Sequence, residues 1–528
     1  MTAAPTPSPG VPTVPAPEAP VLAALAFALS LALGLYLNLR LGIVEGDAMS
    51  RVADAFYVLF SRDPHLGAIG FVWNPLPSLL ALPLVALRPL LPALVTRGLA
   101  AVVVSSALAA VAVRALVRLA ARMGLGAAPR IAFALAWLAN PLVLLYGADG
   151  MTDLMFLAAV LAALDGVAAY LDGAGVMALA GGGMWLAAAF LIRYEAAAAA
   201  AGLTLGLAFA LVRQGRGRRE VEGLLLVFTA PVVYAAFLWL FANWLIMKDP
   251  LYFVLSPYGN ASQIATGGYA TPALAQAAHR LGATLAYAAR RLLLFPPAAP
   301  ALLLAPAVWL AGRRGDALPA AWLGLMAVPA LECAFLYAGR LAGWDRFFLA
   351  YVPAGFVLAA WLVGQVPAAP RTAVGLAAAL LLTAGDAGTL WALTTPLGHG
   401  DRAVVQAVLA GERQHPFAEA DAVDAYLDRR PDATVLADTF LAGAVVVRDE
   451  RPRRFVVTSD RDFASVLASP RGRVRYLLVP RPTGLGALDA VNRAYPRLWA
   501  GGVAWARLVR AFPGPDGFRL YSVGPAAP

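Results

Sequence analysis

Long apolar runs follow one another through the first three quarters of this 528-residue chain. Runs of roughly 17 to 24 residues with few charges are long enough to cross a bilayer as helices. Hydrophobic residues make up 61% of the chain and charged residues only 14%, which leaves more apolar surface than a water-soluble fold of this size can bury. The sequence therefore predicts a polytopic α-helical membrane protein.

Eleven of these runs predict eleven crossings. They lie at residues 21–42, 98–120, 130–148, 151–171, 176–192, 195–212, 223–246, 290–311, 317–338, 348–364 and 372–394. Residues 71–94 form one more long apolar stretch, but several prolines interrupt it, and a straight helix does not tolerate them. We expect this stretch to be a broken segment at the membrane interface and not a span.

The arginines indicate the orientation of the spans, because positively charged loops tend to stay in the cytoplasm. In the eleven-span scheme one side receives Arg122, Arg130, Arg213, Arg216, Arg218, Arg219, Arg313, Arg314 and Arg371. We therefore expect a cytoplasmic N-terminus, with residues 1–20, rich in Pro and Ala, as a disordered tail. These loops also account for the net charge of +10 without a nucleic-acid partner. The abundance of Ala and Arg is typical of a GC-rich bacterial genome, which indicates a bacterial plasma membrane.

The chain divides into a membrane domain at 21–394 and a C-terminal domain at 395–528. In the latter, short β-like runs at 434–438, 454–458, 474–480 and 518–523 alternate with helical stretches such as 417–429, which predicts a small α/β domain. An odd number of crossings places this domain outside. It lacks a glycine-rich phosphate motif, so we assign it no nucleotide.

Residues 43–97 form the first outward loop in this scheme. Apolar residues between Met49 and Phe60 recur at helical spacing there, opposite Ser50, Arg51 and Asp54. The pattern predicts a helix, which either lies flat on the membrane or packs as an ordinary loop helix.

Charged residues gather at the outward ends of the spans, where a pocket between helices would need them. They are Asp47 after the first span, Asp149 and Asp153 around the turn between the third and fourth, Arg193 and Glu195 between the fifth and sixth, Lys248 after the seventh, and Arg346 before the tenth. Any one of the acids could instead cap a helix or sit in headgroup water. Together they predict one charged site on the outer face.

Carboxylates can deprotonate an acceptor hydroxyl or bind a cation, whereas Arg and Lys can hold a phosphate and stabilise it as a leaving group. The mixture suits transfer of a group from a lipid phosphate. The sequence has no His/Cys metal spacing, no GxSxG motif and no Walker loop. It therefore gives no support to a zinc hydrolase, a serine hydrolase or an ATP-driven machine.

Several short motifs carry a resemblance to a known family. They are EGDAMSR around Asp47, Asn74-Pro75-Leu76-Pro77, Arg97, NPLVLLYGADGMTD at 140–153, Arg193-Tyr194-Glu195, KDPLYF at 248–253 and WDRFFLAYVP at 344–353. In this order they resemble the GT-C superfamily of membrane glycosyltransferases, and most of all its branch of protein O-mannosyltransferases and aminoarabinose transferases. The resemblance covers nearly all of the first 365 residues.

Membership of that family implies a sugar donor linked to polyprenyl phosphate and an acceptor outside the cytoplasm, which would be a cell-envelope glycan, a lipid or a protein. It implies Asp47 as the catalytic base, with Asp149 or Asp153 assisting through acceptor contacts or a cation. The donor phosphate would be held by Arg193 and Arg346. If a divalent cation takes part, its ligands would come from Asp47, Asp149 and Asp153; no other cofactor is expected.

The sequence departs from the family pattern at two places. Trp73 and Asn74 stand where a basic residue usually precedes the Pro-Leu segment, so phosphate contacts would come from Arg51, Arg193 or Arg346 instead. Asp47 is followed by Ala48 and not by a second acid, which argues against protein O-mannosylation as the specific reaction.

Two other functions remain open from the residues. A transporter or lipid flippase could use the same charges to line a path across the membrane, although such proteins usually have internal repeats and midplane charges that we do not find here. Alternatively, the membrane part could be a scaffold for the C-terminal domain. The sequence leaves open the identity of the sugar and of the acceptor.

Overall fold

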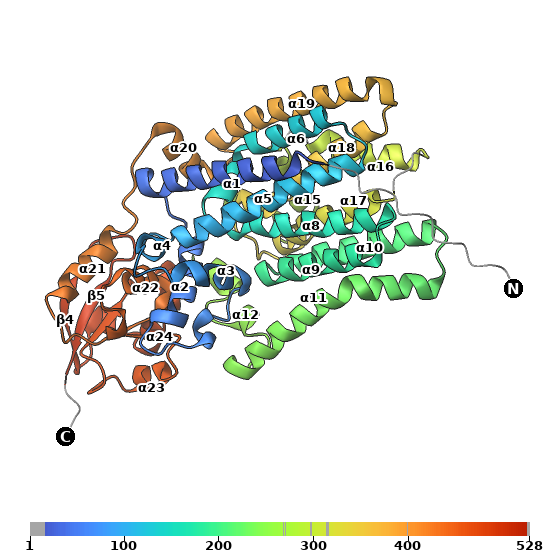
Figure 1. Cartoon of the computed structure of the whole chain (residues 1–528). Helices are drawn as coiled ribbons and strands as arrows, with labels where there is room; N and C mark the ends of the chain where they lie inside the picture. The colour runs from blue at the N-terminus through green and yellow to red at the C-terminus, as the bar shows by residue number, and fades with distance from the viewer. Residues whose placement is uncertain are drawn as a thin grey trace.

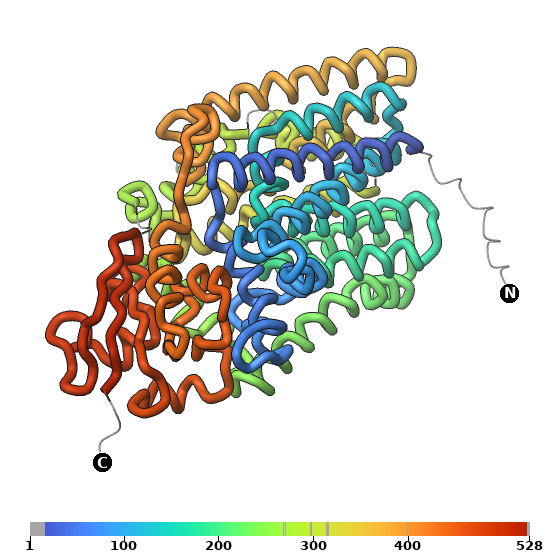
Figure 2. The backbone as a smooth tube through the Cα atoms, turned by 60° about the vertical axis from the view of Figure 1, so that its left-hand side comes forward, coloured from blue at the N-terminus to red at the C-terminus, as the bar shows by residue number. Residues whose placement is uncertain are grey.

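A computed structural model of the chain describes residues 16–267, 269, 271–295, 298–312, 316–398 and 400–524. Long helices lie side by side in a bundle, and a small sheet with its own helices lies at one end of that bundle (Figures 1 and 2). The N-terminal end of the first helix, α1, lies at the opposite end of the bundle from this sheet in both views. The bundle and the sheet correspond to the two parts that the sequence predicts, although the proposed domain boundaries stay a prediction.

Within the described residues, eight helices are long and apolar enough to cross a membrane. They are α1 (Ala19–Leu35) continued by η1 (Tyr36–Leu41), α5 (Leu99–Arg122), α8 (Thr152–Leu171), α10 (Ala196–Arg213), α11 (Arg218–Met247), α17 (Leu318–Tyr337), η3 (Asp345–Phe348) with α18 (Tyr351–Gly364), and α19 (Ala368–Thr394). The chain is therefore a multi-pass membrane protein, as predicted.

The other three predicted spans are helical but not full-length straight helices. The third is a pair of helices, α6 (Ala127–Ala139) and α7 (Pro141–Ala148), bent by 68° at Asn140. The fifth is α9 (Val176–Ile192), with 17 residues. The eighth shortens to the 13 residues of α16 (Ala298–Leu310), because residues 290–292 belong to a separate helix, α15 (Leu281–Leu292).

The stretch at 71–94 is broken, as predicted. Helix α3 (Leu76–Val85) ends after ten residues, and α4 (Ala93–Thr96) follows only after a turn. Ten helical residues extend about 15 Å, which is half of a bilayer core. The prolines predicted this break correctly.

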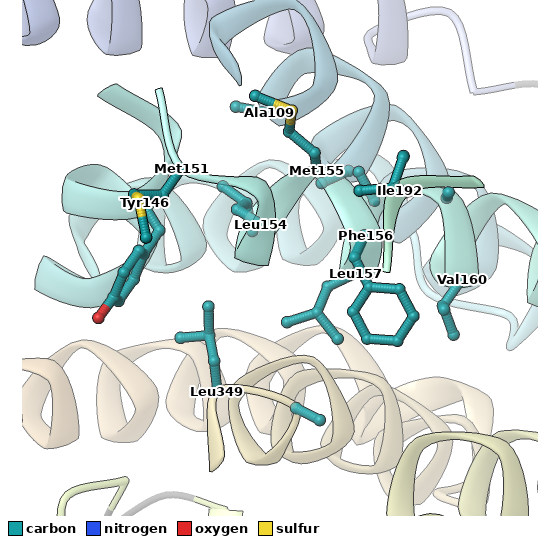
Figure 3. Packing of buried hydrophobic residues seen from close by; sticks show 14 of the residues in the cluster. Ala109, Tyr146, Met151, Leu154, Met155, Phe156, Leu157, Val160, Ile192 and Leu349 are labelled. Atoms are coloured by element: carbon teal, nitrogen blue, oxygen red, sulfur yellow. The ribbon is translucent and has the colours of Figure 1, made fainter. Parts of the chain in front are cut away.

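Helix α8 lies inside the bundle. Of its most apolar stretch, 78% is buried, compared with 83% for η3 with α18 and 28% for the peripheral α19. Figure 3 shows its side chains from Leu154 to Val160 packed between Ala109 of α5 and Leu349, just before α18. Glycines permit close contact elsewhere: a Cβ at Gly202 or Gly206 of α10 would overlap the backbone of α17.

Helix α2 (Gly46–Phe60) is the helix that the sequence predicts in the first loop. Its apolar residues Val52, Phe56 and Tyr57 are buried, and so is Arg51 on the opposite face. It packs against α3 and α5 of the bundle and against α22 (Thr439–Arg448) beside the sheet. Helix α2 therefore packs against protein, and whether it also lies at the membrane surface stays a prediction.

The C-terminal sheet has five strands in the order β2-β1-β3-β5-β4. They are β1 (Val435–Ala437), β2 (Phe455–Val457), β3 (Tyr476–Val479), β4 (Ala506–Ala511) and β5 (Arg519–Val523). Strand β1 pairs in parallel with β2 and β3, whereas β5 is antiparallel to β3 and β4. Four strands lie where the sequence predicts them; β4 was missed because it is an exposed edge strand with Arg507 and Arg510 in it.

Helices surround this sheet and connect it to the bundle. They are α20 (Arg402–Ala410), α21 (Ala418–Asp428), α22, α23 (Phe463–Ala468), α24 (Ala490–Ala494) and α25 (Leu498–Gly501). Helix α21 matches the helix predicted at 417–429. Polar contacts cross the interface: Arg448 Nη1 donates to the Thr96 carbonyl at 2.7 Å, and Arg62 Nε lies 3.0 Å from Asp460 Oδ2. The sheet is therefore fixed against the end of the bundle where α2 lies.

Candidate active site

Asp47 lies in the first turn of α2 and faces Arg346, in the short helix η3 that precedes α18. Arg346 Nη2 is 3.2 Å from Asp47 Oδ2, and the Asp47 side chain is 50% exposed whereas that of Arg346 is only 13% exposed. The guanidinium also lies 4.3 Å from the ring centre of Trp344 and 3.9 Å from Met151 Sδ. A rigid cation is thus paired with a carboxylate that solvent can reach.

Arg193 is the second buried cation of the site, at the turn between α9 and α10. Its Nη1 is 2.8 Å from Asp153 Oδ1, and its Nη2 is 2.5 Å from Glu195 Oε1. Burial alone would lower the pKa of Arg193, but Asp153 and Glu195 raise it above its ordinary value. Three residues that the sequence nominated separately therefore form one ion-pair network.

A cavity of about 250 Å³, its opening included, lies between these two arginines. Five charged side chains line it: Asp153, Arg193, Glu195, Glu332 and Arg346. Apolar side chains of α8, α17 and the η3–α18 segment complete the wall. The cavity thus combines phosphate-binding cations with carboxylates in an otherwise apolar surround.

A second acidic group lies beside Asp47. Asp149 ends α7 and accepts a hydrogen bond from the Met151 amide at 2.8 Å, and both Asp401 oxygens accept from the Tyr146 hydroxyl at 2.8 Å. Burial raises the pKa of Asp149 well above its usual range, and the nearby Glu45 adds to the shift. Burial likewise raises the pKa values of Glu45 and Asp401, against the opposing effect of Arg346. These carboxyls therefore hold protons more tightly than free carboxyls do.

The predicted metal ligands are engaged elsewhere. Asp47 pairs with Arg346, Asp153 with Arg193, and Asp149 accepts from a backbone amide. In the part of the chain that the structure describes, no group of three or more His, Cys, Asp or Glu side chains is arranged to hold a metal ion. A divalent cation at these three residues stays a prediction.

The connection between α11 and α15 covers the site and reaches the sheet. Phe253, of the KDPLYF motif, packs on Tyr194 with ring centres 5.0 Å apart, and Tyr269 packs on Trp344 at 4.8 Å. Between them, the Tyr258 hydroxyl donates to Asp438 Oδ2 at 2.7 Å, at the carboxyl end of β1. The same segment thus contacts the Arg346 environment and the C-terminal sheet.

Comparison with known proteins identifies the fold. No protein-family model matches the chain, and no curated protein matches it in sequence. Among solved structures, ArnT from Cupriavidus metallidurans bound to undecaprenyl phosphate matches at TM-score 0.55 and 13% identity, over 96% of this chain and 99% of that chain. The apo form of ArnT matches at TM-score 0.56 and 13% identity, over 96% and 98% of the two chains. The chain has the fold of ArnT, a GT-C fold.

A third structure, the archaeal oligosaccharyltransferase AglB from Archaeoglobus fulgidus, gives a TM-score of 0.43 at 13% identity over 95% of this chain and 74% of its own. The GT-C resemblance that the sequence motifs indicated is confirmed at the level of the fold by the match to ArnT. Of the charged residues that the sequence singled out, Asp153, Arg193, Glu195 and Arg346 line the cavity, whereas Asp47 and Asp149 do not.

Two of the predicted substrate-binding residues are not brought into that cavity. Lys248 occupies an exposed left-handed position at the end of α11, with φ 62°, and donates to the Leu245 carbonyl. The side chain of Arg51, which belongs to α2, is buried. Its guanidinium lies 5.1 Å from the ring centre of Trp73 and 3.5 Å from the Asn74 carbonyl. Neither residue lines the cavity.

The structure adds Glu45, Glu332 and Asp401 to the residues that the sequence singled out. Glu332 is the only charged residue in α17, so a lone acid in an apolar run is the signal that would have found it. Glu45 lies two residues before Asp47 within a motif already noted. Asp401 gave no signal in the sequence, because its partner Tyr146 is 255 residues away.

Proposed function

We propose that this protein is an integral membrane glycosyltransferase that moves a sugar from a polyprenyl-phosphate donor to an acceptor outside the cytoplasm. The observation that carries the proposal is the pairing of Asp47 with Arg346 at a cavity that also holds the Arg193 network. The arrangement offers a base and a phosphate-binding cation within reach of the same reacting atoms.

In the proposed reaction an acceptor hydroxyl attacks the anomeric carbon of the donor. A new carbon–oxygen bond forms, the bond from the anomeric carbon to the phosphate oxygen breaks, and the phosphate leaves with the electron pair. Asp47 takes the proton of the hydroxyl, and Arg346 stabilises the charge that develops on the phosphate. Asp47 suits the role of base because it is the most exposed carboxylate of the group and is held in place by its ion pair.

Arg193 has a different part in this proposal. Because it already binds Asp153 and Glu195, its positive charge adds to the field on the phosphate while its geometry is fixed by those two carboxylates. Asp153 then acts mainly by holding Arg193. Asp149 remains a candidate for contacts to the acceptor or to a cation.

The donor class is supported by the fold. ArnT, whose fold this chain shares, has been crystallised with undecaprenyl phosphate. The acceptor would be an envelope glycan, a lipid or a protein.

The proposed orientation keeps the N-terminus in the cytoplasm and the C-terminal sheet outside. The end of the bundle where α1 begins is rich in arginine: Arg130 Nε lies 2.6 Å from Glu18 Oε1, and Arg371 Nη1 donates to the Gly124 carbonyl. Arg313 and Arg314 belong to the same prediction but lie outside the described residues. The positive-inside rule then assigns this end to the cytoplasm and the Asp47 end to the opposite side.

The proposal is tested by assaying the purified protein in lipid nanodiscs with a panel of radiolabelled polyprenyl-phosphate sugars and with envelope extracts as acceptor. Wild-type protein should transfer label from at least one donor, and Asp47→Asn should lower the rate by roughly 10²-fold or more, since it removes a general base. Asp172→Asn, at the opposite end of the bundle beside Arg122, is the matched control and should retain full activity.

Two results would overturn the proposal. One is the absence of transfer from every donor. The other is movement of intact lipid-linked sugar across a vesicle membrane without transfer, which would favour a flippase instead.

A further inference from the structure

Glu332 is a buried acid that the proposed reaction does not use. It lies in the apolar helix α17, is 2% exposed, and lines the cavity between the two arginines. No hydrogen bond or ion pair joins it to another residue that the structure describes. A carboxyl group buried at membrane depth without a partner is costly, so its presence calls for a group that binds it.

The charges around the cavity supply no such group. Asp153 and Glu195 bind Arg193, and Asp47 binds Arg346, so both guanidinium groups are engaged. The charged neighbours of Glu332 are Glu195, Arg193 and Asp153. Glu332 is thus the carboxyl group of this cavity that lacks a counterpart on the protein.

An occupant of the cavity can supply what the protein does not. The cavity is open to solvent, and its volume of about 250 Å³ includes that opening, so a polar group of a bound ligand can reach the wall where Glu332 lies. With the donor phosphate at Arg346, the sugar attached to it would extend toward α17. The polar groups of a sugar that can donate a hydrogen bond are its hydroxyls and any amino group.

We propose that Glu332 accepts a hydrogen bond from a hydroxyl or amino group of the donor sugar and thereby selects which sugar is transferred. The inference rests on the proposed function. Glu332 acts on specificity and not on the chemical step, because it lies in the cavity wall on α17 and pairs with neither Asp47 nor Arg346, to which the chemical step is assigned. A sugar lacking the matching group would leave the carboxyl group unpaired, and such a site rejects its analogue strongly.

The experiment measures kcat/KM for a set of short-chain polyprenyl-phosphate donors: a hexose that the wild type transfers, its monodeoxy analogues and the matching amino sugars. Wild-type protein should transfer one deoxy analogue at least 10-fold less well than the parent. Glu332→Met keeps the volume but removes the acceptor, so it should lower transfer of the parent to the level of that analogue and leave the analogue itself unchanged. The Glu332→Met substitution removes a buried carboxyl group that has no partner. The variant should therefore unfold at the same temperature as the wild-type protein or at a higher one.

Glu332→Gln distinguishes the two sources of the hydrogen bond. Glutamine still accepts from a neutral hydroxyl, so a hydroxyl-bearing donor should lose only a few-fold in kcat/KM, whereas a donor with a positively charged amino group should lose 10-fold or more. Glu220→Gln, on the exposed start of α11, is the matched control and should behave as wild type.

The proposed role of Glu332 is overturned if Glu332→Met lowers transfer of the parent and of every deoxy analogue by the same factor, or if it changes none of them. Such a result would leave the transfer activity itself standing. Absence of transfer by the wild type with all donors would instead overturn the proposed function, and this inference with it.

Discussion

Arg346 and Asp47 form an ion pair although 299 residues separate them in the chain. Arg346 comes from the short helix before α18, and Asp47 comes from the loop helix after α1. The pair therefore forms only when these two distant segments of the chain have packed together. The arginine is held by Trp344 and Met151, while the aspartate stays half exposed. The pair therefore presents a fixed cation and an accessible base side by side.

Replacement of Arg346 by glutamine should weaken binding of polyprenyl phosphate about 10- to 100-fold, because a hydrogen bond to a charged group contributes roughly 1.5 to 3 kcal/mol. The measurement is the dissociation constant of polyprenyl phosphate for protein in nanodiscs. Arg219→Gln, exposed near the start of α11, serves as control and should bind as wild type. Unchanged affinity in Arg346→Gln would remove this residue from the phosphate site.

The ion pairs of Arg193 with Asp153 and Glu195 should contribute strongly to the stability of the folded protein. Asp153 is 3% exposed, so Asp153→Asn leaves a buried guanidinium with one carboxylate, and breaking such a pair costs about 3 to 5 kcal/mol. The apparent melting temperature in detergent should fall clearly. Glu220→Gln breaks a pair whose side chains are 45% and 46% exposed, worth about 0.3 to 0.5 kcal/mol, and should melt as wild type. Similar small losses in both variants would contradict the expectation.

Asp54 should make stability depend on pH. Burial in α2 raises its pKa from 3.8 to about 7, against the attraction of Arg51. Since the folded state binds the proton more tightly than the unfolded state, the Asp54 contribution is full below pH 4 and is lost as the pH rises from about 4 to about 7. Asp54→Asn should therefore be more stable than wild type at pH 8 by up to a few kcal/mol, at about 1.4 kcal/mol per pH unit, and much less so at pH 4.

Melting temperatures of wild type and Asp54→Asn at pH 4, 6 and 8 measure this effect. Asp249→Asn, in the exposed turn after α11, is the control, because asparagine can still accept the hydrogen bond from the Leu251 amide. The same difference between Asp54→Asn and wild type at all three pH values would show that Asp54 does not titrate on folding in this range.

Tyr258 should anchor the segment between α11 and α15 to the sheet. Its hydroxyl donates to Asp438, Arg493 Nη2 donates to that hydroxyl at 3.1 Å, and its ring packs on Phe440. Tyr258→Phe removes the hydroxyl alone and should weaken this contact by about 1 to 3 kcal/mol. Hydrogen exchange should quicken in residues 260–266. Tyr495→Phe, which removes a hydroxyl bond inside the C-terminal part, should leave that exchange unchanged.

The sequence predicted what depends on local patterns. Apolar runs predicted all eleven helical regions, and the prolines predicted the break after Val85. Charges at span ends predicted Asp47, Asp153, Arg193 and Arg346 as residues of one end. The sequence does not show which side of each helix faces the inside of the bundle. Lys248 shares that end but follows α11, which runs along the outside of the bundle (Figure 1).

The sequence also does not predict hydrogen bonds between residues that lie far apart in the chain. The hydrogen bonds of Asp401 with Tyr146, and of Tyr258 with Asp438, depend on how helices and sheet pack and leave no periodic trace. Glu332 is a different case: its position as a lone acid in α17 was visible, but only the cavity shows that it faces the arginines. The same limit applies to the surroundings of α2, which packs on the distant helix α22 as well as on α3 and α5.

That burial of α2 sets the order in which the protein can mature in the cell. One side of α2 packs on α5, made soon after it, and the other on α22, which begins at Thr439. At about 5 to 20 residues per second, a ribosome needs on the order of tens of seconds to add the intervening chain. The side of α2 that packs on α22 therefore stays uncovered until that segment has been synthesised and folded. A chain that ends before α22 would leave this side of α2 exposed, so the surroundings of Asp47 are completed only late in folding.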